Sequence, residues 1–125
     1  MAKTLTIQIK PAREALEGFR QTFKTLQAGR RVHRRGGIYF TSIEAARNLL
    51  TPTRLALLRA IRRYRPRSIY ELAKLLNRDL KNIQDDLRLL EEYGLVRMTR
   101  KRGVGRRKVK TPEALFEEIA LKVAI

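Results

Sequence analysis

The sequence contains no cysteine and no tryptophan, and its single histidine is His33. The absence of cysteine excludes disulfides, thiolate metal sites and a cysteine nucleophile. With one histidine and only two serines, Ser42 and Ser68, a hydrolytic triad cannot readily be assembled. A lone histidine without cysteine or carboxylate neighbours is also a poor metal ligand. We therefore predict that the protein is not an enzyme and that it carries no metal ion or other cofactor.

Acidic residues are also scarce. The 125 residues include 29 Lys and Arg but only 12 Asp and Glu, which gives a formal net charge of +17. Such an excess of positive charge predicts attraction to a polyanion. The chain has no apolar run long enough for a membrane span, no evident targeting segment and no strongly apolar amphipathic face. We therefore expect a nucleic acid as the partner, no membrane, and a cytoplasmic, nucleoid-associated location.

The first 50 residues predict an extension made of a strand, a helix and a basic loop. Residues 4–10 alternate polar and apolar side chains, as a half-buried strand does. Pro11 then begins a helix that reaches Ala28, and its apolar stripe packs either on the protein's own core or against a second subunit. The arginine-rich residues 29–37 form either a solvated loop or an arm that enters the minor groove of a duplex.

A short strand and another helix follow this loop. The strand is expected at residues 38–40. Thr41 and Glu44 then have the spacing of a capping box, in which each side chain accepts a hydrogen bond from a free amide at the helix start. The helix that they begin is expected to bury Ile43, Ala46 and Leu50.

The next helix begins at Thr51 and Pro52, a helix cap followed by a residue that suits the first helical position. It ends before Pro66. Its buried residues are predicted to be Leu55, Leu58 and Ile61.

Two shorter helices then meet across a tight turn. Ser68 and Glu71 form a capping box at the start of the first of them, and Asp79 is the predicted cap of the second. Gly94 ends the second, because glycine accepts the left-handed conformation common at helix ends. Two helices in this arrangement form a helix-turn-helix. The expected apolar stripes are Ile69, Leu72, Ala73 and Leu76 on the first helix, and Leu80, Ile83, Leu87 and Leu90 on the second.

A strongly basic hairpin is predicted directly after these helices. Eight of the fourteen residues 97–110 are Lys or Arg, and none is acidic. Gly103 and Gly105 mark a turn between strands expected at residues 95–101 and 107–110. In this position a hairpin can reach the backbone of a duplex whose groove holds the preceding helix.

The segments ELAKLL (71–76) and LLEEYGLV (89–96) resemble the winged helix-turn-helix of MarR-like and ArsR-like prokaryotic regulators. The preceding LTPTRLALL (50–58) narrows this resemblance to a small family of predicted MarR-like transcriptional regulators from archaea and bacteria. Some members of that family are similar to antitoxins encoded beside a small toxin. The resemblance covers the chain from about residue 39 onward. One departure is the acidic pair Asp85 and Asp86, where such regulators more often carry Ser, Arg or His.

The residue patterns and the resemblance together predict an α+β, mainly helical fold in three parts, of which the resemblance implies the winged helix-turn-helix. Residues 1–50 are the strand-helix extension, residues 51–111 are the winged helix-turn-helix DNA-binding domain, and residues 112–125 are a C-terminal segment that packs on the extension. Residues 111–113 look like a helix start, but Ile119, Leu121, Val123 and Ile125 alternate in a strand pattern. We therefore predict a strand from Glu118 onward.

The predicted function is that of a sequence-specific regulator that binds double-stranded DNA as a homodimer. Asn82 and Gln84 suit two-point contact with adenine, while Asp85 can accept from the cytosine amino group or orient Arg88. The basic hairpin is expected to supply sequence-independent affinity for phosphate. The predicted DNA-binding residues are Ser68, Tyr70, Lys81, Asn82, Gln84, Asp85, Arg88, Arg100, Lys101, Arg102, Arg106 and Arg107.

The two ends of the chain are expected to pair, because an isolated strand is not stable. The pairing can lie within one subunit or across a dimer. The predicted dimerisation residues are Leu5, Ile7, Ile9, Leu16, Phe19, Phe23, Ile119, Leu121 and Val123.

Two other functions are compatible with the sequence. The family resemblance allows an antitoxin that neutralises a neighbouring small toxin and regulates its own operon. The charge of +17 also permits an RNA-binding protein, although aromatic residues make up only 6% of the chain and no stacking platform is evident.

Overall fold

The computed structural model describes residues 3–10, 37–102 and 108–125. The helix and basic loop expected between Pro11 and Gly36 lie outside these residues. The chain divides into two compact units, one built from residues 1–3 and 49–117 and the other from residues 4–48 and 118–125. The described residues form four helices and five strands, so the fold is α+β, as predicted. None of these four helices has the length and apolar character needed to cross a membrane.

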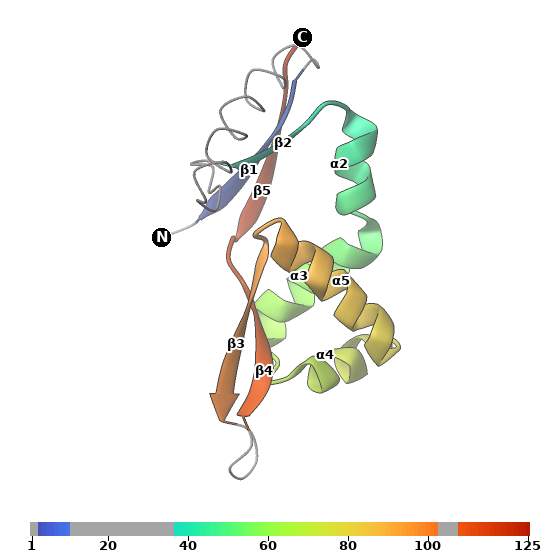
Figure 1. The fold of residues 1–125 in the computed structure, drawn as a ribbon, viewed down its shortest axis with the longest axis vertical. Helices are drawn as coiled ribbons and strands as arrows, with labels where there is room; N and C mark the ends of the chain where they lie inside the picture. Colours follow the sequence, from blue (N-terminus) through green and yellow to red (C-terminus); the bar gives the residue numbers. More distant parts are fainter. Residues whose placement is uncertain (1–2, 11–36, 103–107) are drawn as a thin grey trace, which may run out of the picture. The chain divides into compact units, whose positions relative to one another are not determined.

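Three helices and a hairpin make up the described part of the first unit (Figure 1). Helix α4 contacts both α3 and α5, while β3 contacts α5 and β4 contacts α3. Each element turns its apolar side toward one shared core. The elements are α3 (Pro52–Tyr64), α4 (Ile69–Leu76), α5 (Leu80–Glu92), β3 (Val96–Arg102) and β4 (Lys108–Ala114). The core residues are Leu57, Leu58, Ala60, Ile61, Leu72, Ala73, Ile83, Leu87, Leu90, Leu95 and Val96.

The predicted caps of α3 and α4 are present. The Thr51 hydroxyl accepts a hydrogen bond from the Arg54 N–H at 3.1 Å, and Pro52 occupies the first turn. The Ser68 hydroxyl accepts from the Glu71 N–H at 3.0 Å. The Glu71 carboxylate accepts from the backbone N–H of Arg67 at 3.2 Å, one residue before the amide of an ideal capping box.

Helix α5 confirms most of the predicted pattern and corrects two points. Ile83, Leu87 and Leu90 are buried as expected, but Leu80 is 38% exposed, because it is the first residue of the helix and lies at the end of the packed stripe. Asp79 has the extended backbone of an N-cap but makes no side-chain cap hydrogen bond. Gly94 follows the helix with a φ of 78°, the left-handed conformation that was predicted.

Helix α2 (Ile43–Leu49) is capped one residue later than predicted. The hydroxyl of Ser42, rather than that of Thr41, accepts from the Ala45 N–H at 3.2 Å. The helix buries Ala46 and Leu49, whereas Ile43 is 42% exposed and Leu50 is half-buried. The predicted burial of Ile43 and Leu50 is therefore wrong, and that of Ala46 is confirmed.

The β3–β4 hairpin extends further along the chain than predicted. Strand β4 continues to Ala114 and includes Pro112, which stands opposite Met98. Residues 111–113, which resemble a helix start in the sequence, thus belong to a strand, and the predicted domain boundary at residue 111 falls within that strand. Proline is tolerated here because β4 pairs on one side only among the described residues, so not every peptide group needs a ladder partner.

A parallel sheet with the order β2-β1-β5 forms the second unit, together with most of α2. Its strands are β1 (Thr4–Ile9), β2 (Gly37–Phe40) and β5 (Glu118–Val123). Both ends of the chain thus pair within one subunit, which confirms the predicted strands and one of the two predicted pairing modes. Leu5, Ile7 and Ile9 are buried in this sheet, while Leu16, Phe19 and Phe23 lie outside the described residues.

The two helix caps in the first unit allow a matched test of capping. Replacing Ser68 by Ala removes a cap hydrogen bond and should lower the free energy of unfolding by about 1 kcal/mol. Asp79→Ala is the control, because Asp79 is also an N-cap but its side chain makes no such bond. Urea unfolding followed by circular dichroism would measure both. Equal losses for the two variants would contradict the role of the Ser68 hydroxyl.

Candidate nucleic-acid interface

The exposed face of α5 is a continuous polar surface. Because Ile83, Leu87 and Leu90 face the core, the positions between them face outward. This surface carries both positive charge and amide groups that can donate and accept hydrogen bonds. Its members are Lys81, Asn82, Gln84, Asp85 and Arg88, all of them exposed as predicted.

Asp86 has a different role from its exposed neighbour Asp85. Its carboxylate accepts from Arg54 Nε on α3 at 3.1 Å and from Arg78 Nη2 in the α4–α5 turn at 2.7 Å. The three side chains are between 15% and 23% exposed, so solvent screens these charges only in part. We call this group the Asp86 clamp. It joins α5 to α3 and to the turn before α5.

The clamp is set into a turn whose backbone is also fixed. Asn77 adopts the left-handed conformation with a φ of 50°, and the Arg78 N–H donates to the Ala73 carbonyl at 3.0 Å. One nitrogen of the clamp, Nη1 of Arg78, is buried and has no hydrogen-bond partner among the described residues.

The sequence pattern contained a signal for this clamp that the prediction did not use. Asp86 follows Ile83 by three residues and precedes Leu90 by four, so it lies beside the buried stripe of the same helix. Asp85 has no such relation to that stripe. Of the two acidic residues that depart from the pattern of MarR-like regulators, Asp86 therefore faces inward and Asp85 faces outward.

Basic residues occupy directly opposed positions in the backbone register of the β3–β4 hairpin. Arg100 stands opposite Lys110, and Arg102 opposite Lys108. Like charges at directly opposed positions destabilise an antiparallel pair. Nearer the helices the pattern changes, because Arg97 Nη2 forms an ion pair with Glu113 Oε2 at 2.8 Å. Among the described side chains, Arg100 and Lys110 thus form a like-charge pair, and Arg97 and Glu113 form a balanced pair nearer the helices.

The base of the hairpin is fastened to the helical part of the unit. The buried Thr111 hydroxyl donates to the Arg67 carbonyl at 2.7 Å, just before α4 begins. Arg62 on α3 donates to the Phe116 carbonyl at 3.5 Å and lies 3.8 Å from a Glu117 carboxylate oxygen. These contacts connect β4 to the backbone before α4, and the residues after β4 to α3.

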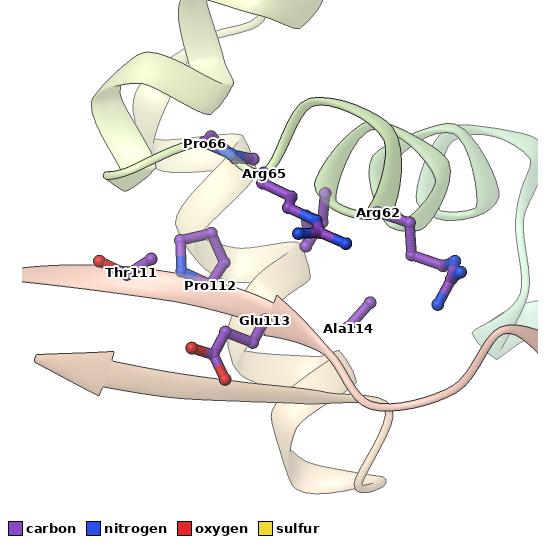
Figure 2. Close-up of a pocket in the computed structure, with 8 residues that line it drawn as sticks. Arg62, Arg65, Pro66, Thr111, Pro112, Glu113 and Ala114 are labelled. Carbon is purple, nitrogen blue, oxygen red and sulfur yellow. The ribbon is translucent and has the colours of Figure 1, made fainter. Parts of the chain in front are cut away.

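A pocket of about 340 Å³ lies between the end of α3 and β4 (Figure 2). Two of its charged groups already have partners, since Arg62 contacts Glu117 and Glu113 contacts Arg97. No group of three or more metal-ligating side chains occurs in the described part of the chain. The pocket is lined by Ile61, Arg62, Arg65, Pro66, Thr111, Pro112, Glu113 and Ala114, which include no histidine or cysteine.

The remaining predicted DNA-binding residues fall into three groups. Ser68 caps α4, and Tyr70 is 59% exposed with the Lys74 ammonium 4.7 Å from its ring centre. Arg100 is exposed on β3. Lys101 and Arg102 continue that strand, but their side chains lie outside what the structure describes, as do Arg106 and Arg107 entirely.

Comparison with known proteins places the chain in a family. Residues 49–121 match the model of the HVO_A0114 family, a span that runs from the end of α2 into β5. The chain belongs to the HVO_A0114 family. The searches of curated proteins and of solved structures found no match.

The two adjacent acidic residues of α5 provide a matched test of the Asp86 clamp. Asp86→Asn keeps the shape of the side chain but removes the negative charge that lies between Arg54 and Arg78. We expect it to lower the free energy of unfolding by about 1–3 kcal/mol. Asp85→Asn, at an exposed position, should change it by less than about 0.5 kcal/mol. Urea unfolding would measure both, and an equal effect of the two substitutions would contradict the clamp.

Proposed function

We propose that the protein is a sequence-specific regulator that binds double-stranded DNA and belongs to the winged helix-turn-helix class, resembling MarR-like transcriptional regulators. In this proposal α4, the turn and α5 are the helix-turn-helix, and the β3–β4 hairpin is the wing. The observation that carries it is the exposed polar face of α5 in the same compact unit as a cation-rich hairpin. The protein acts as a homodimer, as most regulators that bind two-fold symmetric sites do.

The chemistry of the α5 surface supports recognition of base edges in the major groove. Asn82 and Gln84 have amide groups that can bond to both N6 and N7 of adenine, and Asp85 can accept from the amino group of cytosine. All three lie in the first turns of α5, the part of a recognition helix that normally enters the groove. Lys81 and Arg88 on the same face add positive charge for phosphate or guanine.

The electrostatics of the hairpin support a polyanionic partner. Arg100 and Lys110 stand at directly opposed positions and repel each other. A phosphate placed between the two cations would interact favourably with both. The helical part of the unit does not need these charges for its packing, because its core is apolar.

Recognition by α5 would be tested by selecting binding sites from a random duplex library. Asn82→Ala should relax the preference at one or two base pairs, at a cost of about 1–3 kcal/mol for each. Glu92→Ala, in the last turn of the same helix and also exposed, should leave every preference unchanged. If Asn82→Ala altered no base preference, the proposed orientation of α5 would be wrong. A consistent preference for RNA over duplex DNA in competition would favour an RNA-binding function instead.

The wing would be tested through the dependence of affinity on salt. Arg100→Ala and Lys110→Ala should each lower the slope of log K against log salt by about 0.9, and should weaken specific and nonspecific duplexes alike. Neither variant should unfold more easily, because each relieves a like-charge opposition. Arg97→Ala is the control, since Arg97 is already paired with Glu113. Loss of specificity with nonspecific binding intact would contradict a wing on the backbone.

A further inference from the structure

Strand β5 is an edge of the parallel sheet and pairs only with β1 among the described residues. The register places Leu121 beside Ile7 and Val123 beside Ile9, so these apolar side chains share one face of the sheet. Ile7 is fully buried, yet Leu121 and Val123 are 55% and 51% exposed. An edge strand with exposed apolar side chains and no proline is a ready template for another strand.

The backbone register identifies the peptide groups that this edge presents. The Ala124 N–H donates to the Ile9 carbonyl at 2.9 Å. Peptide groups alternate in direction along a strand, so even-numbered residues of β5 pair with β1. The odd-numbered Ile119, Leu121 and Val123 therefore direct their N–H and C=O groups toward the open edge.

We propose that a second copy of this chain pairs antiparallel along β5, with Ala120 on the two-fold axis. In this register Ile119 and the partner's Leu121 exchange both backbone hydrogen bonds, which uses the peptide groups that face the edge. Glu118 then stands opposite the partner's Lys122, and the symmetry repeats this pair. Two three-stranded sheets become one continuous six-stranded sheet.

Charge complementarity selects this register from its neighbours. Moving the partner by one symmetric step in either direction would place Glu118 opposite an alanine, either Ala120 or Ala124, and would leave both charges without a counterpart. Opposite charges at directly facing positions stabilise an antiparallel pair, and like charges destabilise it. The apolar side chains of both copies also lie on the same side of the joined sheet, as burial of that face requires.

This interface is the one through which the homodimer of the proposed function forms, so the inference rests on that function. A symmetric pairing uses the same strand in both subunits, so it closes as a dimer and leaves no further β5 edge for a third copy. Each subunit also brings one α5, which supplies the two recognition helices that a two-fold symmetric DNA site would use.

Charge exchange at Glu118 and Lys122 would test the pairing, with the mass in solution measured by light scattering or sedimentation. The unaltered protein should have twice the 14.6 kDa mass of the chain. Glu118→Lys places two lysines opposite each other at both ends of the interface, and Lys122→Glu does the same with two glutamates. Each variant alone should be a monomer. The double variant, and an equimolar mixture of the two single variants, should both be dimers.

A control separates the interface from the sheet within one subunit. The Thr4 hydroxyl donates to a Glu118 carboxylate oxygen at 2.8 Å, and Glu118→Lys also removes this bond. Thr4→Val removes the same bond and keeps both charges, so this variant should remain a dimer. Hydrogen exchange of the unaltered protein provides a measurement that needs no variant. The amides of Ile119 and Leu121 should exchange slowly, because in this register each donates to a carbonyl of the partner strand.

Several results would overturn the proposal. These are a monomeric unaltered protein, dimers in both single variants, failure of the mixture to associate, and fast exchange of the Ile119 and Leu121 amides in a dimer. Because none of these measurements uses DNA, they are independent of the proposed function. A protein that dimerises as described but binds no duplex would contradict the DNA-binding proposal alone, and a protein that binds duplex without this pairing would contradict the interface alone.

Discussion

The burial of one face of α5 is the constraint on which the rest of the candidate interface depends. A helix of 13 residues that turns Ile83, Leu87 and Leu90 into the core cannot rotate about its axis without exposing them. Complete burial of such side chains contributes about 1.5–3 kcal/mol each, more than the polar residues on the other face contribute to folding. The Asp86 clamp also restricts rotation of α5 about its axis. Ion pairs with hydrogen-bond geometry are directional, so they tolerate less displacement than apolar contacts do. The outward direction of Asn82 and Gln84 is thus a consequence of packing on the opposite side.

The contacts and the charge pattern of the hairpin differ between its two ends. At its base, Thr111 and the Arg97–Glu113 pair connect the strands to the helices and to each other. Farther out, cations stand opposite cations, and the strands are held together against this repulsion by their backbone ladder. A charge pattern selected only for stability would alternate signs at these positions. The polyanionic partner of the proposed function would account for this pattern, because phosphate can interact with both cations at a small loss of hairpin stability.

Local rules predicted much of this fold, and the errors have identifiable causes. Thr51 with Pro52, Ser68 with Glu71, and Gly94 each act within one helical turn, so their effect was visible in the sequence. At α2 the capping-box spacing of Thr41 and Glu44 indicated the wrong hydroxyl, because the adjacent Ser42 is the cap in the structure. Pro112 suggested a helix start in the sequence. In the structure it belongs to β4 and stands opposite Met98 of β3, a pairing that the residues next to Pro112 do not indicate. The clamp was missed for a similar reason: its two arginines, Arg54 and Arg78, belong to other elements, and no local pattern connects them to Asp86.

For the sheet of the second unit, the sequence predicted that the two terminal strands pair but not the relative direction in which they run. Alternation in residues 4–10 and 118–123 predicted two half-buried strands, and each needed a neighbour. Alternation carries no information about strand direction, however, and the structure makes β1 and β5 parallel. Parallel pairing requires a long connection, and here residues 49–117, the helical unit, are inserted between the strands of the sheet. Contacts so distant in sequence form late in folding, because loop closure costs entropy before the contacts stabilise the chain. The register with β1 then decides which peptide groups of β5 face outward, so a long-range feature of the fold determines the chemistry of its exposed edge.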